Sequence, residues 1–371
     1  MNYGGKPMKK VSLLLTFALL AGMLAGCAGT PVIYYTDCTC PVDSHETVLQ
    51  GTLPGMLLPE VPAAEGALKT GLYISTGIGD SKAAGAEENG EAKYDVTMVA
   101  VLVDDNGIIR ECIIDGISTS VKFDNTGAIT TDLNAAPQTK NELGENYGMV
   151  AWGGAIAEWD EQAAALASYA VGKTVEELKN GAIDETGKAP AGSDLASSAT
   201  IYLGGYVSAI EMAAANARHL GAQAGDTLKL ATVTGIDSSK AADAENAGNA
   251  QLDATVTVLT VSGETITSCA IDSVQAKVAF DASGAITSDL SAPVQTKNEL
   301  GENYGMVAWG GAIAEWNQQA ASFAAYVTGK TAEDVAGIAV NESAKPTDAD
   351  LAASVTISIG DFQALIAKAC Q

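Results

Sequence analysis

A perfect internal duplication limits what this chain can fold into more than any other feature does. The segment QTKNELGENYGMVAWGGAIAEW occurs at 138–159 and again at 295–316 without a single difference. Diverged matches surround both copies of this copied segment, such as TGIGDSKAA with TGIDSSKAA, and GKTVEEL with GKTAEDV. Each repeat is about 150 residues long, which is the size of one domain. The pattern predicts two homologous domains at 69–219 and 227–371, joined by a linker at 220–226.

The amino terminus is typical of an exported protein. Two lysines precede an apolar run at 11–20, which is too short and wrongly flanked for a stable membrane span. The run leads into Leu-Ala-Gly-Cys27, which resembles the lipobox of bacterial lipoproteins and implies cleavage before Cys27 and its diacylation. An ordinary secretory signal with a chance cysteine is the alternative. We predict a lipoprotein signal peptide at 1–27, a flexible tether at 28–68, and an extracytoplasmic protein anchored in the cell membrane.

The charge of the chain excludes one class of partner. The net charge is -25, and only 20 residues are basic. Nucleic acid demands clustered Lys and Arg for its phosphates, so no nucleic-acid partner is expected. The same charge repels an anionic membrane surface and favours a soluble domain that its lipid holds near the membrane.

Alternating runs in each repeat predict strands. Val- and Thr-rich stretches at 95–103 and 253–261 are suited to half-buried strands. The turns DDNG and SGE then lead into second strands at 108–114 and 265–271. We expect a third strand to follow in each repeat, and another turn to begin at Asp124.

The end of the copied segment is predicted to open a helix. Apolar residues recur there at spacings of three and four, a pattern that turns one helix face toward a core. The stripe comprises Trp152, Ile156, Trp159, Ala163, Leu166 and Tyr169 in the first repeat, and Trp309, Ile313, Trp316, Ala320, Phe323 and Tyr326 in the second.

The last third of each repeat completes the predicted architecture. Thr174 and Thr331, each followed three residues later by an acid, resemble caps that open a second short helix. β-like runs at 198–203 and 354–359 then precede a final helix. The order predicts an α+β fold in which each domain is an antiparallel β meander with helices packed on one face.

The sequence carries little of the usual catalytic machinery. His45 and His219 are the only histidines, and neither falls inside a predicted domain core. No nucleophile elbow, P-loop or dinucleotide-binding glycine pattern stands in a suitable context, and no spacing singles out a pair of carboxylates. Enzymatic activity stays uncertain, with a non-catalytic electron carrier or a binding protein favoured.

One short run before the last predicted helix points to a cofactor. It reads DLASSAT at 194–200 and DLAASVT at 350–356. Both runs resemble the D-x-x-S-G-A-T signature of the FMN-binding domain family. The resemblance implies that the final threonine, Thr200 or Thr356, carries FMN through a phosphoester installed by a flavin transferase. It also implies that the transferase recognises the leading Asp194 or Asp350, and that the protein passes electrons to a redox partner in the cell envelope.

Both runs depart from that signature. Ser198 and Ser354 stand where the family has glycine, which would permit a positive φ or the close approach of a flat ring. The first run keeps Ala199 of the signature, whereas the second changes that position too. Thr200 is therefore the better acceptor, and Thr356 is expected to be labelled less or not at all. The alternative is a fold that persists without its cofactor.

The perfect identity of the copied segment has two explanations. Core residues drift by compensated swaps, as Leu166 and Phe323 do just downstream, so identity indicates a functional surface. The segment is predicted to line a cleft for a planar ligand, with a lysine near a phosphate. The candidates are Lys140, Tyr147 and Trp152 in the first copy and Lys297, Tyr304 and Trp309 in the second. Recent gene conversion is the alternative, because it copies sequence irrespective of function.

Two functions from different classes follow. In the first, the protein is a lipid-anchored electron carrier with covalent flavin on the first repeat. In the second, it is a cofactor-free surface lipoprotein that binds a small molecule or an envelope protein, with two sites that add avidity.

Overall fold

The unit that the computed structural model describes comprises residues 65–371. Two three-stranded antiparallel sheets and their helices make up this unit, which confirms the predicted α+β fold with two similar domains. The predictions for the signal peptide, for Cys27 and for most of the tether lie outside the described residues.

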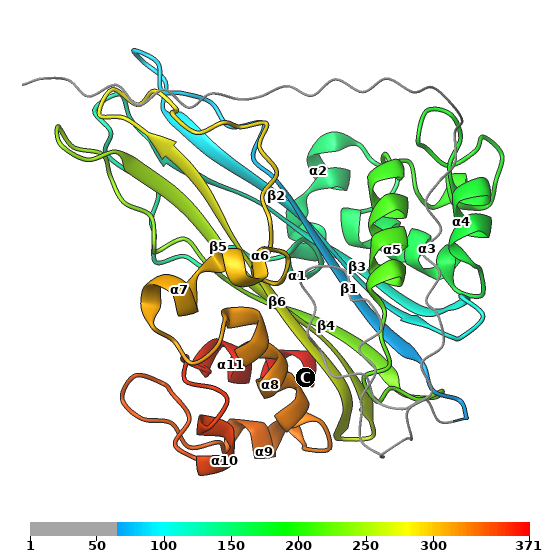
Figure 1. Ribbon diagram of the computed structural model, residues 1–371. Helices are drawn as coiled ribbons and strands as arrows, with labels where there is room; N and C mark the ends of the chain where they lie inside the picture. Colours follow the sequence, from blue (N-terminus) through cyan, green and yellow to red (C-terminus); the bar gives the residue numbers. More distant parts are fainter. Residues whose placement is uncertain (1–64) are drawn as a thin grey trace, which may run out of the picture. The chain divides into compact units, whose positions relative to one another are not determined.

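The first repeat is a meander of strands followed by helices (Figure 1). The strands pair in the order β1-β2-β3, and the predicted turn at Asp104 joins the last two. The strands are β1 (Lys69–Gly77), β2 (Gly90–Val103) and β3 (Ile109–Phe123). The helices are α1 (Lys140–Leu143), α2 (Met149–Gly153), α3 (Trp159–Ala170), α4 (Val175–Ala182) and α5 (Gly204–Asn216), with the 3-10 turns η1 (Gly144–Tyr147) and η2 (Leu195–Ser197).

The second repeat follows the same plan. Its strands are β4 (Thr227–Gly235), β5 (Gly248–Ser262) and β6 (Thr265–Phe280). Its helices are α6 (Lys297–Leu300), α7 (Met306–Gly310), α8 (Trp316–Val327), α9 (Ala332–Ala336), α10 (Ala349–Ala352) and α11 (Gly360–Ala369), with the 3-10 turn η3 (Gly301–Tyr304). Both predicted capping arrangements are present, since the Thr174 and Thr331 side chains accept hydrogen bonds from the backbone three residues on.

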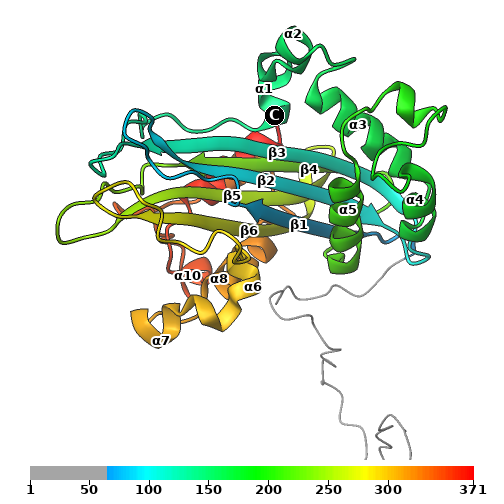
Figure 2. The same ribbon diagram turned by 90° about the horizontal axis from the view of Figure 1, so that it is seen from above.

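The sheets lie face to face between two layers of helices. Figure 2 shows α1 to α5 on one side of the paired sheets and α6 to α8 on the other. Successive residues of a strand point to opposite faces, so β2 contributes side chains to two cores. Val99 and Val101 pack with the helices of their own repeat, whereas Met98 and Ala100 pack toward the other sheet. Each sheet is therefore covered on both faces.

The inner faces of the two sheets form a core that both repeats share. Phe123 and Phe280 stack in it with their ring centroids 4.0 Å apart and their planes within 4° of parallel. The hydroxyls of Thr70 and Ser268 also meet across it at 2.8 Å. The sequence predicts a separate core for each half. The structure has one for each half, and adds this shared core because the inner face of each sheet is apolar as well.

The strand assignment needs one correction. In each repeat the second and third predicted strands form one long strand, which is β3 in the first repeat and β6 in the second. The edge strands β1 and β4 were not predicted. A polar residue, Asp115 in β3, separates two apolar runs and imitates a strand end. Asp115 is nevertheless buried, and its carboxylate accepts hydrogen bonds from the backbone.

Two further predictions need correction, one for a helix and one for the β-like runs. The predicted apolar stripe is interrupted because Gly154 adopts a left-handed conformation, with φ of 64°, and ends α2 before α3 begins. Trp152 and Ile156 therefore point to solvent, with 91% and 57% of their surface exposed. The predicted β-like runs at 198–203 and 354–359 are irregular segments without strand pairing. The backbone N–H groups of Thr200 and Thr356 donate to glutamine side chains instead of to a neighbouring strand.

Candidate functional site

A buried carboxylate holds the start of the copied segment in each repeat. The Asp115 Oδ1 atom accepts a hydrogen bond from the Asn141 N–H at 3.1 Å, and Asp272 accepts one from Asn298 in the same way. Burial raises the pKa of Asp115 to about 6 and that of Asp272 to about 7. The first turn of each copied segment is thus fixed to the third strand of its sheet.

The predicted lysine and tyrosine come together in both copies. The Lys140 Nζ atom lies 5.2 Å from the ring centroid of Tyr147 and 4.8 Å from that of Trp159. Lys297 has the same distances to the matching rings of Tyr304 and Trp316. Cation–π contact stabilises each ammonium group at this position.

The predicted tryptophan does not join this group, because it lies on an exposed loop. We call residues 148–157 and 305–314 the Trp loops. Trp309 is 85% exposed and Ile313 is 60% exposed, which matches the exposure of Trp152 and Ile156 in the first copy. Figure 2 shows α2, in the first Trp loop, above the two sheets and α7, in the second, below them. Each repeat therefore presents one apolar loop to solvent.

The Trp loops are held in one conformation by a buried acid. The Glu158 carboxylate accepts hydrogen bonds from the Met149 and Val150 N–H groups at 2.8 and 3.0 Å. Glu315 makes the same pair of bonds in the second repeat. Glu158 is 6% exposed, and such charge-assisted bonds are among the stronger ones in proteins. The exposed indole is thus carried on a pre-organised support.

An acidic cleft of about 590 Å³ adjoins the first Trp loop. Its lining includes Val150 together with Glu145, Glu158, Asp160 and Glu161. The second repeat has amides in place of the last two acids, Asn317 and Gln318. The two Trp loops are therefore identical, whereas the charge beside them differs.

The threonines of the FMN-like signature are docked on the third helix of each repeat. The fully buried Gln162 side chain accepts a hydrogen bond from the Thr200 N–H at 2.8 Å and one from its hydroxyl at 3.3 Å. Gln319 binds Thr356 in the same way, at 2.8 and 3.2 Å. The contact is the same in both repeats, although the second signature departs further from the family.

The other signature residues surround this contact. Asp194 and Asp350 are exposed, whereas Ala199 is buried. Ser198 has φ of -118°, so this position does not require the conformational freedom of glycine. Thr200 is exposed and Thr356 is half-buried.

A cradle for flavin would require the signature and the copied segment to meet. Lys140 contacts the ring of Trp159 in the first turn of α3, and Thr200 donates a hydrogen bond to Gln162 in the same turn. No hydrogen bond or ring contact joins Lys140 to Thr200 within residues 65–371. Trp152 points away into solvent. The candidates therefore form separate small groups.

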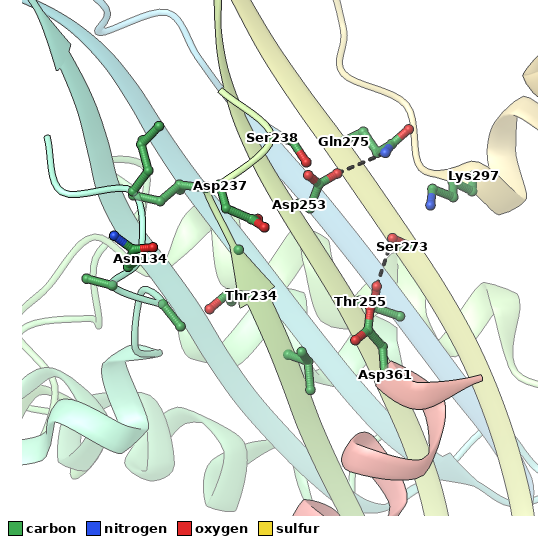
Figure 3. Close-up of a pocket in the computed structure, with 16 residues that line it drawn as sticks. Asn134, Thr234, Asp237, Ser238, Asp253, Thr255, Ser273, Gln275, Lys297 and Asp361 are labelled. Atoms are coloured by element: carbon green, nitrogen blue, oxygen red, sulfur yellow. Dashed lines mark hydrogen bonds between the residues drawn. The ribbon is translucent and has the colours of Figure 1, made fainter. Parts of the chain in front are cut away.

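A second cleft, of about 610 Å³, lies over the strands of the second sheet (Figure 3). Strands β4, β5 and β6, the start of α6, the start of α11 and the loop at 133–136 all contribute to it. Lys297 is the one predicted residue in its lining. The charged and amide side chains that line it include Asp237, Asp253, Gln275, Lys297 and Asp361.

Sequence reasoning missed most of the residues that build these sites. Gln162 and Gln319 are the same amino acid at matching positions, which is a signal that the repeat alignment could have used. The cleft residues are shared only in part, because Asp253 and Lys297 have counterparts in the first repeat whereas Asp237 and Gln275 do not, so no shared motif marks the cleft. The sequence feature that could have indicated the cleft is a substitution between the repeats, in which Gln251 stands where the first repeat has Lys93.

Residues 65–371 contain no cluster of three His, Cys, Asp or Glu side chains arranged to hold a metal ion. In the same part of the chain, no helix combines the length and the apolar character that a membrane span needs. Comparison of the chain with protein-family models, with curated proteins and with solved structures finds no match.

Proposed function

We propose that the protein is a lipid-anchored extracytoplasmic binding protein whose two Trp loops dock on a partner that presents the same chemical unit more than once. The observation that carries the proposal is the exposure of Trp152 and Trp309, 91% and 85%, inside segments that are identical. Exposed apolar clusters mark interaction sites, and tryptophan is enriched among the residues that dominate binding.

The shape of the loops favours a flat ring as the bound unit. The Trp152 indole lies beside Gly148 and is 91% exposed, and a Cβ added at Gly153 or Gly154 would meet nothing within 4 Å, so the loop leaves open space around its tip. The same holds for Gly310 and Gly311 in the second loop. An indole face with open space beside it can stack on the apolar face of a sugar ring, and nearby carboxylates can accept hydrogen bonds from sugar hydroxyls.

Charge and duplication define the partner further. A net charge of -25 disfavours anionic polymers, which leaves neutral or cationic ones. Two identical loops on one chain gain avidity only when the partner repeats the recognised unit. A neutral glycan polymer of the cell envelope meets both conditions.

Co-sedimentation of the purified protein with insoluble neutral glycan tests the proposal. Trp152→Ala and Trp309→Ala should each weaken binding by about tenfold, which is the usual effect of losing a central aromatic. The double variant should lose at least about a further tenfold, because avidity is lost as well. Tyr202→Ala is the matched control, since Tyr202 is an aromatic residue that is 59% exposed outside the loops.

Two outcomes would contradict this function. One is undiminished glycan binding by the double tryptophan variant. The other is sedimentation with neutral lipid vesicles, lost in the double variant, without any binding to glycan. That result would make the Trp loops membrane contacts.

Covalent flavin on the first repeat is the second candidate, and the exposure of Thr200 favours it. A transferase can reach an exposed hydroxyl, and Thr356 is less exposed than Thr200. A flavin bound there would supply one- and two-electron chemistry. Its phosphate would be attached to Thr200, while Gln162 would hold the backbone of the same residue.

Coexpression with a flavin transferase tests this candidate. A yellow product is expected, with the added mass on the peptide that contains Thr200. Thr200→Ala should remove the label and leave the fold intact, whereas Thr356→Ala should change the yield little. A colourless product, with the transferase active on another substrate, would contradict the carrier function.

A further inference from the structure

The two repeats differ on the central strand of their sheets, where the first contains a cation that the second lacks. In the first repeat, Lys93 of β2 places its Nζ atom 3.5 Å from Asp95 and 3.5 Å from Asp80. In the second repeat, Asp253 matches Asp95, but Gln251 stands in place of the lysine. The first sheet thus neutralises these carboxylates with its own side chain.

Amides hold Asp253 in the second repeat. The Gln251 Nε2 atom donates to both of its oxygens at 2.9 and 2.7 Å, and Gln275 donates to one at 2.9 Å. Gln275 in turn accepts a hydrogen bond from the Tyr304 hydroxyl at 2.9 Å. This network orients the Asp253 carboxylate and leaves its charge in place.

The cleft of about 610 Å³ opens over this part of the second sheet. Asp253, Asp237 and Asp361 line it from three different elements (Figure 3). No Lys, Arg or His nitrogen of residues 65–371 lies within 4 Å of these three carboxylates. Lys297 acts on Asp253 and Asp361 only at longer range, so a cationic group of a ligand would find carboxylates that are not held in a direct ion pair.

Lys297 provides the opposite charge on another side of the same cleft (Figure 3). Its ammonium group rests against the rings of Tyr304 and Trp316. In the part of the chain that the structure describes, no carboxylate oxygen lies within 4 Å of it. The Asp253, Asp272 and Asp361 carboxylates act on Lys297 only at longer range, so its ammonium group can still form a direct pair with an anionic group of a ligand.

We propose that this cleft binds a small zwitterion of the amino acid or short peptide class. The ammonium group of the ligand lies near Asp253, where Lys93 supplies the cation in the first repeat, and its carboxylate pairs with Lys297. The volume of about 610 Å³ falls within the usual range of small-ligand sites. Three acids against one lysine disfavour a purely anionic ligand.

Isothermal titration with alanine and alanylalanine tests this site. We expect binding of at least one of the two. Acetylation of the amino group or amidation of the carboxylate should weaken binding by at least about tenfold, because each removes one charged contact. Binding of blocked and unblocked forms with equal affinity would overturn the proposal, as would no binding of either probe at about 10 mM.

Variants locate the site within the molecule. Gln251→Lys introduces the cation of the first repeat and should abolish binding, while Asp361→Asn and Lys297→Met should each weaken it by about tenfold or more. Asp361 is exposed, so its variant folds even if the buried Gln251→Lys does not. Lys93→Gln is the matched control in the first repeat and should leave the affinity unchanged. Undiminished binding by both Asp361→Asn and Lys297→Met would overturn the assignment.

Discussion

The two repeats agree in their exposed Trp loops and differ at some of the positions that pack behind those loops. The Trp loops are identical, whereas a residue that contacts the tryptophan at the start of α3 or α8 has been exchanged. Trp159 donates a hydrogen bond to the Tyr206 hydroxyl at 3.0 Å in the first repeat. In the second, Trp316 meets Phe362 edge to face, with 5.9 Å between ring centroids.

This is the reverse of the common pattern, in which surfaces drift faster than cores. Leu166 in the first repeat corresponds to Phe323 in the second, so the core has been repacked at similar volume. Packing constrains volume but tolerates compensated swaps, whereas a binding surface constrains each side chain. The comparison favours selection for binding on the Trp loops over packing as the reason for their identity.

The largest expected effect comes from the core that the repeats share. Phe123→Ala and Phe280→Ala should each lower the free energy of unfolding by about 3–5 kcal/mol, the usual cost of removing a buried aromatic. Both repeats should then unfold in one transition at lower urea, followed by circular dichroism. Phe323→Leu, which copies Leu166, is a control within one repeat and should cost about 1–2 kcal/mol. Two separate transitions in either alanine variant would show that the halves are independent.

The buried aspartates should give the next largest effect, through pH. The folded pKa of Asp272, about 7, lies above the ordinary aspartate pKa of 3.8, so the folded state binds more protons between these values. Stability contributed by this site is therefore present at low pH and falls as pH rises through that window. A separation of about three pH units corresponds to about 4 kcal/mol at most.

Paired variants isolate this pH effect. Asp272→Asn should flatten the decline in unfolding free energy between pH 4 and 7, measured by urea titration at several pH values. Asp115→Asn should flatten it less, because the pKa of Asp115 is raised only to about 6. A wild-type protein whose stability rises across this range in parallel with both variants would contradict the expected burial effect.

The supports of the Trp loops should differ in a smaller way. Glu158→Gln and Glu315→Gln each lose a charge-assisted bond to the backbone, at a cost of about 1–3 kcal/mol. The cost should be lower for Glu158, because Asp160 and Glu161 repel it and the second repeat has amides there. Hydrogen exchange at Met149, compared with its counterpart in the second loop, measures the difference. A difference that high salt leaves unchanged would exclude repulsion as its cause.

The smallest effect on stability is expected for Lys93 of β2. Lys93→Gln removes two ion pairs that are open to solvent, and such pairs contribute about 0–1 kcal/mol. The change should reproduce the amide of the second repeat at little cost in urea stability. A loss above about 2 kcal/mol would mean that the lysine supports the sheet rather than merely neutralising its carboxylates.

Local chemistry explains which parts of the fold could be predicted. The turn at Asp104 and the caps at Thr174 and Thr331 depend on hydrogen bonds between residues a few positions apart, and all three are present. The edge strands β1 and β4 were missed because their pairing depends on partners in another strand. The prediction of one continuous helix along the apolar stripe was wrong, because hydrophobic periodicity does not reveal the left-handed turn at Gly154.

The candidate site was predictable only in part, for the same reason. Lys140 and Tyr147 meet because they lie within one short segment whose first turn is capped. Their separation from Trp152 depends on which way the chain turns after α2. The cleft at Lys297 combines residues from both repeats, and no local pattern contains it.

The sequence by itself determined the duplication, the turns, the caps and the α+β class, because these depend on side chains acting on their own stretch of backbone. Only the tertiary structure decided that the sheets share a core, that the tryptophans are exposed and that a cleft opens beside one lysine. Burial is a property of the surfaces that meet, and the Thr70–Ser268 contact joins residues 198 positions apart. Periodicity in one repeat shows that a face is apolar, but the choice between solvent, a helix and another sheet belongs to the folded chain.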